Sequence, residues 1–155
     1  MEIMRRIDKE IIDRSAIEAI IEASFVCRLA LSDGEQPYIV PLCFGYHDMT
    51  LFFHGAQEGT KIDLIRKNNK VCFEFDLNAE AVEDEKACGW GVRYRSVIGF
   101  GKAFLLDNFK EKQRALDTIF SHYSEKKPQM TEKAIKATAV IKVVIEKIFG
   151  KQSGY

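Results

Sequence analysis

The sequence predicts one antiparallel β-barrel with helices inserted at its connections. Six or seven apolar segments have the length and composition of strands, and most are separated only by short turn sequences. Short turns join antiparallel neighbours, whereas parallel strands need long crossovers. The three helical segments fall at connections and do not alternate regularly with strands, which argues against a doubly wound parallel sheet. A chain of 155 residues favours a single domain over residues 1–155.

The first helix is expected over residues 16–23. Its three isoleucines follow the i, i+3, i+4 spacing of one apolar helix face, and Asp13 or Ser15 can cap its first turn. Residues 1–9 before it are charged and are expected to be irregular. Residues 25–31 after it are almost continuously apolar, which predicts a largely buried strand.

A hairpin and an unusual second strand are expected next. Asp33-Gly34 is a strong hairpin signal and joins the first strand to a second one over residues 36–46. Pro41 lies inside that second strand and has no amide to donate. The strand should therefore be an edge, carry a bulge or lie where the ladder opens. Another tight turn leads to a third strand over residues 50–53.

The remaining elements alternate between strands and two further helices. Residues 108–123 predict an amphipathic helix with its apolar side chains on one face. A shorter helix follows Lys61 and ends near Asn68-Asn69, a pair that tolerates the left-handed conformation. The other segments are strands over residues 71–75, 90–106 and 137–148, a polar surface loop over residues 78–89, and a tail over residues 150–155.

Composition and charge exclude several classes of partner. The 23 basic and 23 acidic residues give a formal net charge of zero, which argues against a nucleic-acid or anionic-membrane partner. No apolar run approaches the ~20 residues that span a bilayer, and the N-terminus lacks the apolar core of a signal peptide. A cytoplasmic location is therefore expected.

The cysteines and histidines show no spacing typical of a metal site, so no metal is expected. Cys27, Cys43 and Cys72 lie in apolar, strand-like runs and are expected to be buried, reduced thiols. His47 and His122 are expected at the surface.

Residues 51–66 combine the features of an anion site. An apolar strand ends in a turn that contains Gly55 and Gly59, and Thr60 and Lys61 open a helix. The first amides of a helix have no internal partner and lie at the positive end of its dipole. The glycines allow close approach of the backbone, so this stretch is a candidate phosphate site. It lacks the spacing of a P-loop. The alternative is an ordinary connection with glycine turns.

Several stretches in consistent order match one known family in combination. They are residues 36–42 (QPYIVPL), 51–56 (LFFHGA) with Gly59 and Lys61, 69–73 (NKVCF), 94–103 (YRSVIGFGKA) and 148–151 (IFGK). Together they resemble the pyridoxamine 5′-phosphate oxidase-like flavin-binding proteins, in particular the nitroimidazole-resistance-type branch. The resemblance implies a split β-barrel homodimer with FMN in two clefts between the subunits.

The resemblance also implies which residues hold FMN. The phosphate contacts would come from the start of the short helix, and the ring contacts from the second strand and the end of the third. A further strand would reach the cofactor partly from the partner subunit. These sets are Gly59, Thr60 and Lys61 for the phosphate; Val40, Pro41, Leu42, His54, Gly55 and Ala56 for the ring and ribityl chain; and Tyr94, Arg95 and Ser96 for the further strand, with Trp90 as a possible ring cover.

The leading hypothesis is an FMN-dependent oxidoreductase that transfers electrons or a hydride to a small aromatic acceptor, such as a nitro compound or another flavin. His54 is the candidate catalytic residue, because a neutral imidazole beside a flavin could donate a hydrogen bond or relay a proton. A structural role for His54 is the alternative.

Two other functions remain open: a non-catalytic flavin-binding protein, and a heme-binding protein with His54 as ligand. Oxidation of pyridoxamine phosphate itself is not expected. Cys43 and Thr60-Lys61 stand where the vitamin B6 oxidases carry basic residues.

Overall fold

The computed structural model describes residues 5–155, so the first four residues of the segment expected to be irregular lie outside the described part. Two 3-10 turns, four helices and eight strands follow one another along these residues. In chain order they are η1 Ile7–Lys9, β1 Glu10–Ile11, α1 Arg14–Ala23, β2 Cys27–Ser32, β3 Pro37–Leu42, β4 Gly45–His47, β5 Thr50–Gly55, α2 Thr60–Lys67, β6 Lys70–Val82, η2 Ala87–Gly89, β7 Gly91–Leu105, α3 Phe109–Tyr123, α4 Glu132–Ala137 and β8 Ala139–Ser153.

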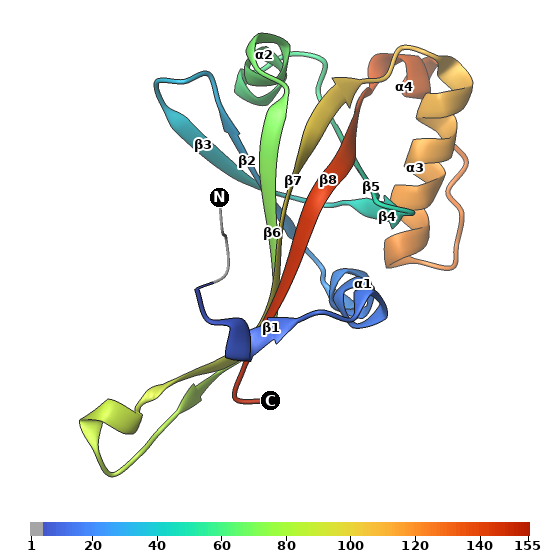
Figure 1. The fold of residues 1–155 in the computed structure, drawn as a ribbon. Helices are drawn as coiled ribbons and strands as arrows, with labels where there is room; N and C mark the ends of the chain where they lie inside the picture. The colour runs from blue at the N-terminus through green and yellow to red at the C-terminus, as the bar shows by residue number, and fades with distance from the viewer. Residues whose placement is uncertain (1–4) are drawn as a thin grey trace.

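The strands form one sheet in the order β3-β2-β6-β7-β8-β5-β4, with the short β1 paired to β8. Every neighbouring pair is antiparallel. Figure 1 shows β6, β7 and β8 running side by side, with β4 and β5 crossing behind them. The expected mainly β fold, a split barrel with appended helices, is confirmed.

The barrel interior holds the main core. Alternate residues of β2, β5, β6, β7 and β8 are buried, as the period of two along a strand requires. The largest fully buried side chains of the barrel include Phe44, Phe53, Phe73, Phe75, Leu29 and Leu51. A second, smaller core lies between α3, α4 and β8 and contains Leu116, Ile119, Ile135 and Val140.

The two longer helices begin at caps that the sequence indicates. Asp13 accepts a hydrogen bond from the amide of Ala16 at the start of α1, and Asn108 accepts one from the amide of Glu111 at the start of α3. Helix α3 lies against β4 so closely that a Cβ at Gly45 would stand 2.7 Å from the backbone nitrogen of Ile119. The glycine therefore permits the approach of the helix.

Three boundary predictions are wrong. The strand expected over residues 36–46 is two strands, because the chain bends between β3 and β4. The loop expected over residues 78–89 begins as strand, since β6 continues to Val82 and pairs with β7. The tail expected over residues 150–155 is strand as far as Ser153, which pairs with Tyr94. Residues 78–82 are all exposed, and residues 150–153 are a glycine and three polar residues, so no apolar alternation marks either segment.

Two predicted side-chain environments also need correction. Cys27 is buried as expected, but Cys43 is exposed because it lies at the bend after β3, and Cys72 is only half-buried on the outer face of β6. His47 is exposed as expected. His122 is instead half-buried, and its Nε2 atom lies 2.7 Å from the carbonyl oxygen of Ser24.

Within residues 5–155, no helix is long and apolar enough to cross a membrane. The described histidine, cysteine, aspartate and glutamate side chains form no group of three or more that could hold a metal ion.

Candidate functional site

The turn between β5 and α2 presents unpaired backbone amides. Gly59 precedes the helix with φ 127°, a conformation that side-chain-bearing residues rarely adopt. Its carbonyl oxygen accepts from the amides of Ile62 and Asp63, and no side chain in the described residues caps the helix. The amides of Thr60 and Lys61, in the first turn, have no intrahelical acceptor. They remain available to an anion at the positive end of the helix dipole.

The side chain of Lys61 extends back over the end of β5. A Cβ built at Gly55 would stand 3.1 Å from Lys61 Nζ, so the missing side chain leaves room for the ammonium group. Burial lowers the pKa of Lys61. Within residues 5–155, no carboxylate lies within 4.0 Å of its ammonium group. A half-buried cation without a counter-ion beside free helix amides fits a phosphate group.

His54 lies next to this cation. Burial lowers the pKa of His54, and the positive charge of Lys61 lowers it further, so both effects favour the neutral form of the imidazole. Strand alternation places His54 on the same outer face as Phe52, whose side chain packs in the smaller core. The ring centroids of His54 and Phe120 are 6.3 Å apart, so α3 forms one wall beside the imidazole.

The loop before α2 is attached to α4 through one carbonyl group. Gln57 Nε2 donates to the backbone oxygen of Lys136 at 2.8 Å, and Lys112 Nζ donates to the same oxygen at 3.2 Å. Lys112 is only 7% exposed. The sequence prediction missed these three residues, because the contacts join positions up to 79 apart and no local pattern marks them.

The candidate ring-binding residues of the second strand lie on the edge strand β3. Pro41 is exposed and pairs only with Arg28 of β2, so the prediction of an edge position for the proline is confirmed. Val40 and Leu42 are half-buried and pack against the barrel core. This short strand therefore offers backbone groups on its unpaired side.

The residues predicted to reach the cofactor from a further strand, Tyr94, Arg95 and Ser96, lie at the opposite end of the sheet from the Lys61 turn. Gly55 pairs with Ala139 at the start of β8, whereas Tyr94 pairs with Ser153 at its end. At about 3.3 Å per residue, fourteen residues of strand span up to roughly 45 Å. A single chain therefore does not bring Tyr94, Arg95 and Ser96 to the turn that contains Lys61. The guanidinium of Arg95 lies instead 4.5 Å from the ring centroid of Tyr155.

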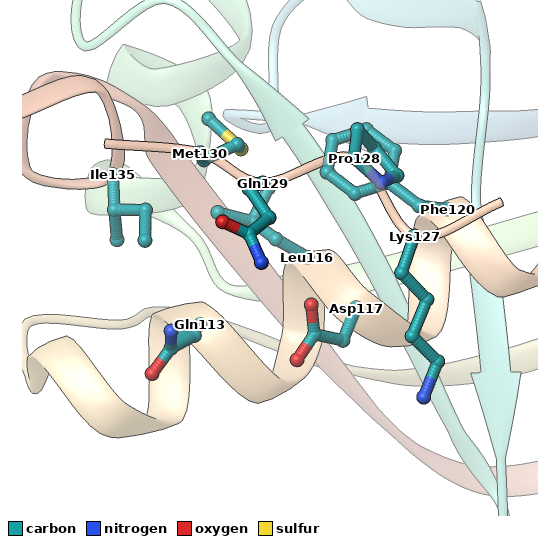
Figure 2. A pocket seen from close by; sticks show the side chains of 9 residues that line it. All are labelled: Gln113, Leu116, Asp117, Phe120, Lys127, Pro128, Gln129, Met130 and Ile135. Atoms are coloured by element: carbon teal, nitrogen blue, oxygen red, sulfur yellow. The ribbon is translucent and has the colours of Figure 1, made fainter. Parts of the chain in front are cut away.

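One cavity described in residues 5–155 adjoins the turn between β5 and α2, where Gln57, Glu58 and Ile62 line it. Five cavities have volumes of about 390 to 470 Å³, and neither His54 nor Lys61 lines them. Figure 2 shows one of about 410 Å³ between α3 and residues 127–135, with Phe120, Leu116 and Met130 in its lining. Phe120 thus lies between this cavity and His54. None of these five cavities contains both the Lys61 turn and the predicted residues of β7.

Comparisons with known proteins place the chain in a family and a fold. The family model described as pyridoxamine 5′-phosphate oxidase matches residues 13–152. A putative 5-nitroimidazole antibiotic resistance protein from Bacteroides thetaiotaomicron is 34% identical over 92% of this chain and 86% of its own, with a TM-score of 0.84.

A FAD and heme binding protein from Mycobacterium smegmatis is similar in fold, with 18% identity over 95% of this chain and 74% of its own, and a TM-score of 0.86. An uncharacterized protein of Rhizobium meliloti is 31% identical over 65 residues, which span 42% of each chain.

Proposed function

Because the chain belongs to the pyridoxamine 5′-phosphate oxidase family, we propose that it binds FMN and transfers electrons or a hydride to a small aromatic acceptor, such as a nitro compound or another flavin. The observation that carries this proposal is the turn between β5 and α2. There Lys61 lies over Gly55, next to free helix amides and a neutral His54. These are the groups that a flavin phosphate and the adjoining ribityl chain require.

The phosphate is assigned to the start of α2. Its oxygens would accept from the amides of Thr60 and Lys61, and the Lys61 ammonium would supply the opposite charge. Since burial disfavours the charged form of this lysine, as its lowered pKa reports, a bound dianion would compensate that cost. FMN, with its terminal phosphate, matches this arrangement directly. The FAD bound by the Mycobacterium protein would need further room for its second phosphate and adenosine.

His54 would act at the cofactor edge as a neutral group. When bound, the flavin supplies the redox chemistry, and the protein supplies orientation and protons. A neutral imidazole can donate from one ring nitrogen and accept at the other. His54 can therefore hold a proton near the ribityl or ring atoms without adding a second positive charge beside Lys61. The ring of Phe120 lies on one side of the imidazole.

A homodimer with one cofactor at each of two interfaces is part of the proposal. One chain separates the Lys61 turn from Tyr94, Arg95 and Ser96 by most of the length of β8. A second copy can supply the missing group. The outer face of the sheet carries the exposed apolar side chains Ile98 (39%), Phe104 (45%) and Val144 (38%), which such a contact would cover.

The four cysteines are free thiols, which supports a reducing, cytoplasmic location.

The first test is the absorption spectrum of the purified protein, followed by release and identification of the chromophore. FMN at about one equivalent per chain is expected. Lys61→Ala should weaken FMN binding about tenfold or more, as loss of a charge-assisted contact predicts. The control is Lys67→Ala, which removes an exposed lysine of the same helix and should leave affinity unchanged. Equal affinities for both variants would refute the phosphate assignment.

Catalysis is tested separately from binding. Turnover of NADH or NADPH with a nitroaromatic acceptor would support an oxidoreductase, and its absence in FMN-loaded protein would favour a flavin-binding role without a dedicated substrate.

Heme is the second candidate ligand, since the half-buried, neutral His54 could ligate iron and a protein of this fold is described as binding heme. A Soret band on heme addition that is lost in His54→Ala would support it. No such band in the wild type would exclude it.

A further inference from the structure

A groove of about 390 Å³ lies between α1 and the parts of β6, β7 and β8 that are remote from the Lys61 turn. We call it the α1 groove. Figure 1 shows α1 beside this end of the sheet, next to the short β1. Six of its lining residues are apolar and belong to β1, α1 and β6, and the other three are Asn78, Arg95 and Gln152. Among the described lining residues only Arg95 is charged, so the groove combines an apolar wall with one cation.

The strand register explains why Arg95 faces this groove. Arg95 lies opposite Leu77 of β6 and opposite Gln152 of β8, and residues directly opposite one another in antiparallel strands present their side chains on one face. Val97, two residues further along β7, is fully buried in the barrel core. Because side chains alternate along a strand, Arg95 lies on the same inner face as Val97, at the end of the barrel beside α1.

Tyr94 and Ser96 lie on the opposite face of β7 from Arg95. The alternation that turns Arg95 inward turns its two neighbours to the outer face of the sheet. A contact of this strand with a cofactor held by a second copy would therefore use the side chains of Tyr94 and Ser96. The side chain of Arg95 is left to the α1 groove.

The apolar wall of the groove comes from a helix that is packed closely on the sheet. A Cβ at Gly150 of β8 would stand 2.8 Å from side-chain atoms of both Ile11 and Ile17, so β1 and α1 lie directly against β8. Ala16 and Ala19 line the groove from the same helix. Their short side chains leave a space between the packed helix and Arg95.

The charge of Arg95 has no partner in the described chain. Its guanidinium lies 4.5 Å from the ring centroid of Tyr155, and this cation–π contact holds it in place. Arg93 lies 5.2 Å from the same centroid and is paired with Glu80. Within residues 5–155, no carboxylate lies within 4.0 Å of Arg95. A half-buried guanidinium without a counter-ion at an apolar groove favours an anionic ligand.

We propose that the α1 groove binds a small organic carboxylate with an apolar body. The carboxylate accepts two parallel hydrogen bonds from the guanidinium of Arg95, whose planar fork matches that group. The side-chain amides of Asn78 and Gln152 line the groove and can donate to the same oxygens. One cation balances one negative charge, which favours a carboxylate over a phosphate dianion.

The apolar body of this ligand lies along α1, against Ala19 and Ile20, and against Leu77 of β6. Sites for small molecules have volumes of about 300–1,000 Å³. The volume of the α1 groove, about 390 Å³, is near the lower end of this range. It accommodates a single ring or a chain of several carbon atoms.

Within one chain the α1 groove is separate from the Lys61 turn. Arg95 pairs with Gln152 near the end of β8, whereas Gly55 pairs with Ala139 at its start. The proposal therefore adds a second small-molecule site, and it does not depend on flavin binding.

Calorimetric titration of the purified protein with octanoate tests this site. A dissociation constant on the order of 1 mM or lower is expected for a ligand of this size. Octylamine has the same chain with the opposite charge, and acetate lacks the apolar body, so each should bind at least tenfold more weakly. No octanoate binding at several millimolar, or equal affinity for octylamine or acetate, would overturn the proposal.

Two arginines of β7 provide a matched pair of variants. Arg95→Met removes the cation of the groove and should weaken octanoate binding at least tenfold. Arg93→Met removes a guanidinium that contacts the same Tyr155 ring but does not line the groove, and should leave the affinity unchanged. Wild-type affinity of Arg95→Met, or equal losses in the two variants, would overturn the assignment of the carboxylate to Arg95.

A third variant tests the groove without changing its charge. Ala19→Phe, at an exposed position of α1, fills the space along the helix and should weaken octanoate binding at least tenfold while the melting temperature stays within a few degrees of the wild type. Octanoate should also shift the backbone amide NMR signals of residues 16–23, Leu77 and Gln152 more than those of the Lys61 turn. Unchanged affinity in Ala19→Phe, or shifts concentrated at the Lys61 turn, would overturn the proposed site.

Discussion

Lys61 and Gly55 meet across the end of β5, where a Cβ at Gly55 would stand 3.1 Å from the lysine Nζ. Such a contact is tight, but the atom that must yield is the far end of a flexible side chain. We therefore expect Gly55→Ala to fold normally, with a melting temperature within a few degrees of the wild type. FMN affinity should fall about tenfold because the ammonium group is displaced from its position over the turn.

Gly59→Ala should differ from Gly55→Ala in its effect on stability. A Cβ at Gly59 meets nothing within 4 Å, but the backbone has φ 127°, which alanine adopts only with strain. This variant should lose both stability and FMN affinity. Thermal unfolding and flavin titration of the two variants separate displacement of Lys61 from strain in the turn. A Gly55→Ala protein with wild-type affinity would show that the ammonium position does not matter.

The pH dependence of stability should contain a contribution from His54. Its folded-state pKa lies below the ordinary value because of burial and of the charge on Lys61. Above pH ~6.5 the imidazole is neutral in both the folded and the unfolded chain and contributes nothing. As the pH falls below ~6.5 the unfolded chain binds the proton first, so the free energy of unfolding decreases until the lower folded-state pKa is reached.

Urea unfolding at pH 7.5 and pH 5 measures this effect. The loss of stability between these pH values should be smaller in His54→Gln than in the wild type. NMR titration of the His54 ring should give a pKa below ~6.5. In Lys61→Met the pKa of His54 should rise, because the nearby positive charge is gone, but it should stay below the ordinary value, because His54 is still buried. A His54 pKa that does not respond to Lys61→Met would contradict the assigned proximity of the two side chains.

Local patterns were sufficient for the strands and helices that bury one face. Residues 108–123 and the Asp13 cap show this, since helix periodicity and cap chemistry are encoded within a few positions. The strand, turn and helix start around the phosphate-site candidates Gly59, Thr60 and Lys61 were predictable for the same reason, because they follow directly in the chain.

Features that depend on long-range contacts were not predictable in this way. Residues 78–82 of β6 fall within the stretch predicted as a loop, because a ribbon exposed on both faces has no hydrophobic alternation. The backbone oxygen of Lys136 accepts hydrogen bonds from the side chains of both Gln57 and Lys112. These three residues belong to segments that only the tertiary fold brings together. The separation of Tyr94 from Lys61 follows from the register of β8, which the strand signals did not specify.

Tyr123 should stabilise the bend between β3 and β4. Its hydroxyl accepts from the amide of the fully buried Phe44 at 3.0 Å and donates to the backbone oxygen of Phe25 at 2.8 Å. Tyr123→Phe leaves that amide unsatisfied, so we expect a loss of about 1–3 kcal/mol in the free energy of unfolding. Urea unfolding measures the loss. Tyr155→Phe, whose hydroxyl bond is exposed, is the control and should cost much less; equal losses would contradict this role of Tyr123.

Gly99 and Phe73 should be energetically coupled. They are paired across β6 and β7, and a Cβ at Gly99 would overlap the buried ring of Phe73. Gly99→Ala should cost about 1–3 kcal/mol or more, because the ring must leave its place in a packed core. Phe73→Leu should also destabilise the protein, through the cavity it leaves.

The double variant tests this coupling in a cycle measured by urea unfolding. In Phe73→Leu the added methyl group has room, so the loss in the double variant should be smaller than the sum of the two single losses by about 1 kcal/mol. Gly91→Ala on the same strand is the control, since a Cβ there meets nothing within 4 Å. Additive losses in the cycle would mean that the alanine methyl is accommodated by movement of the backbone and not at the expense of the Phe73 ring.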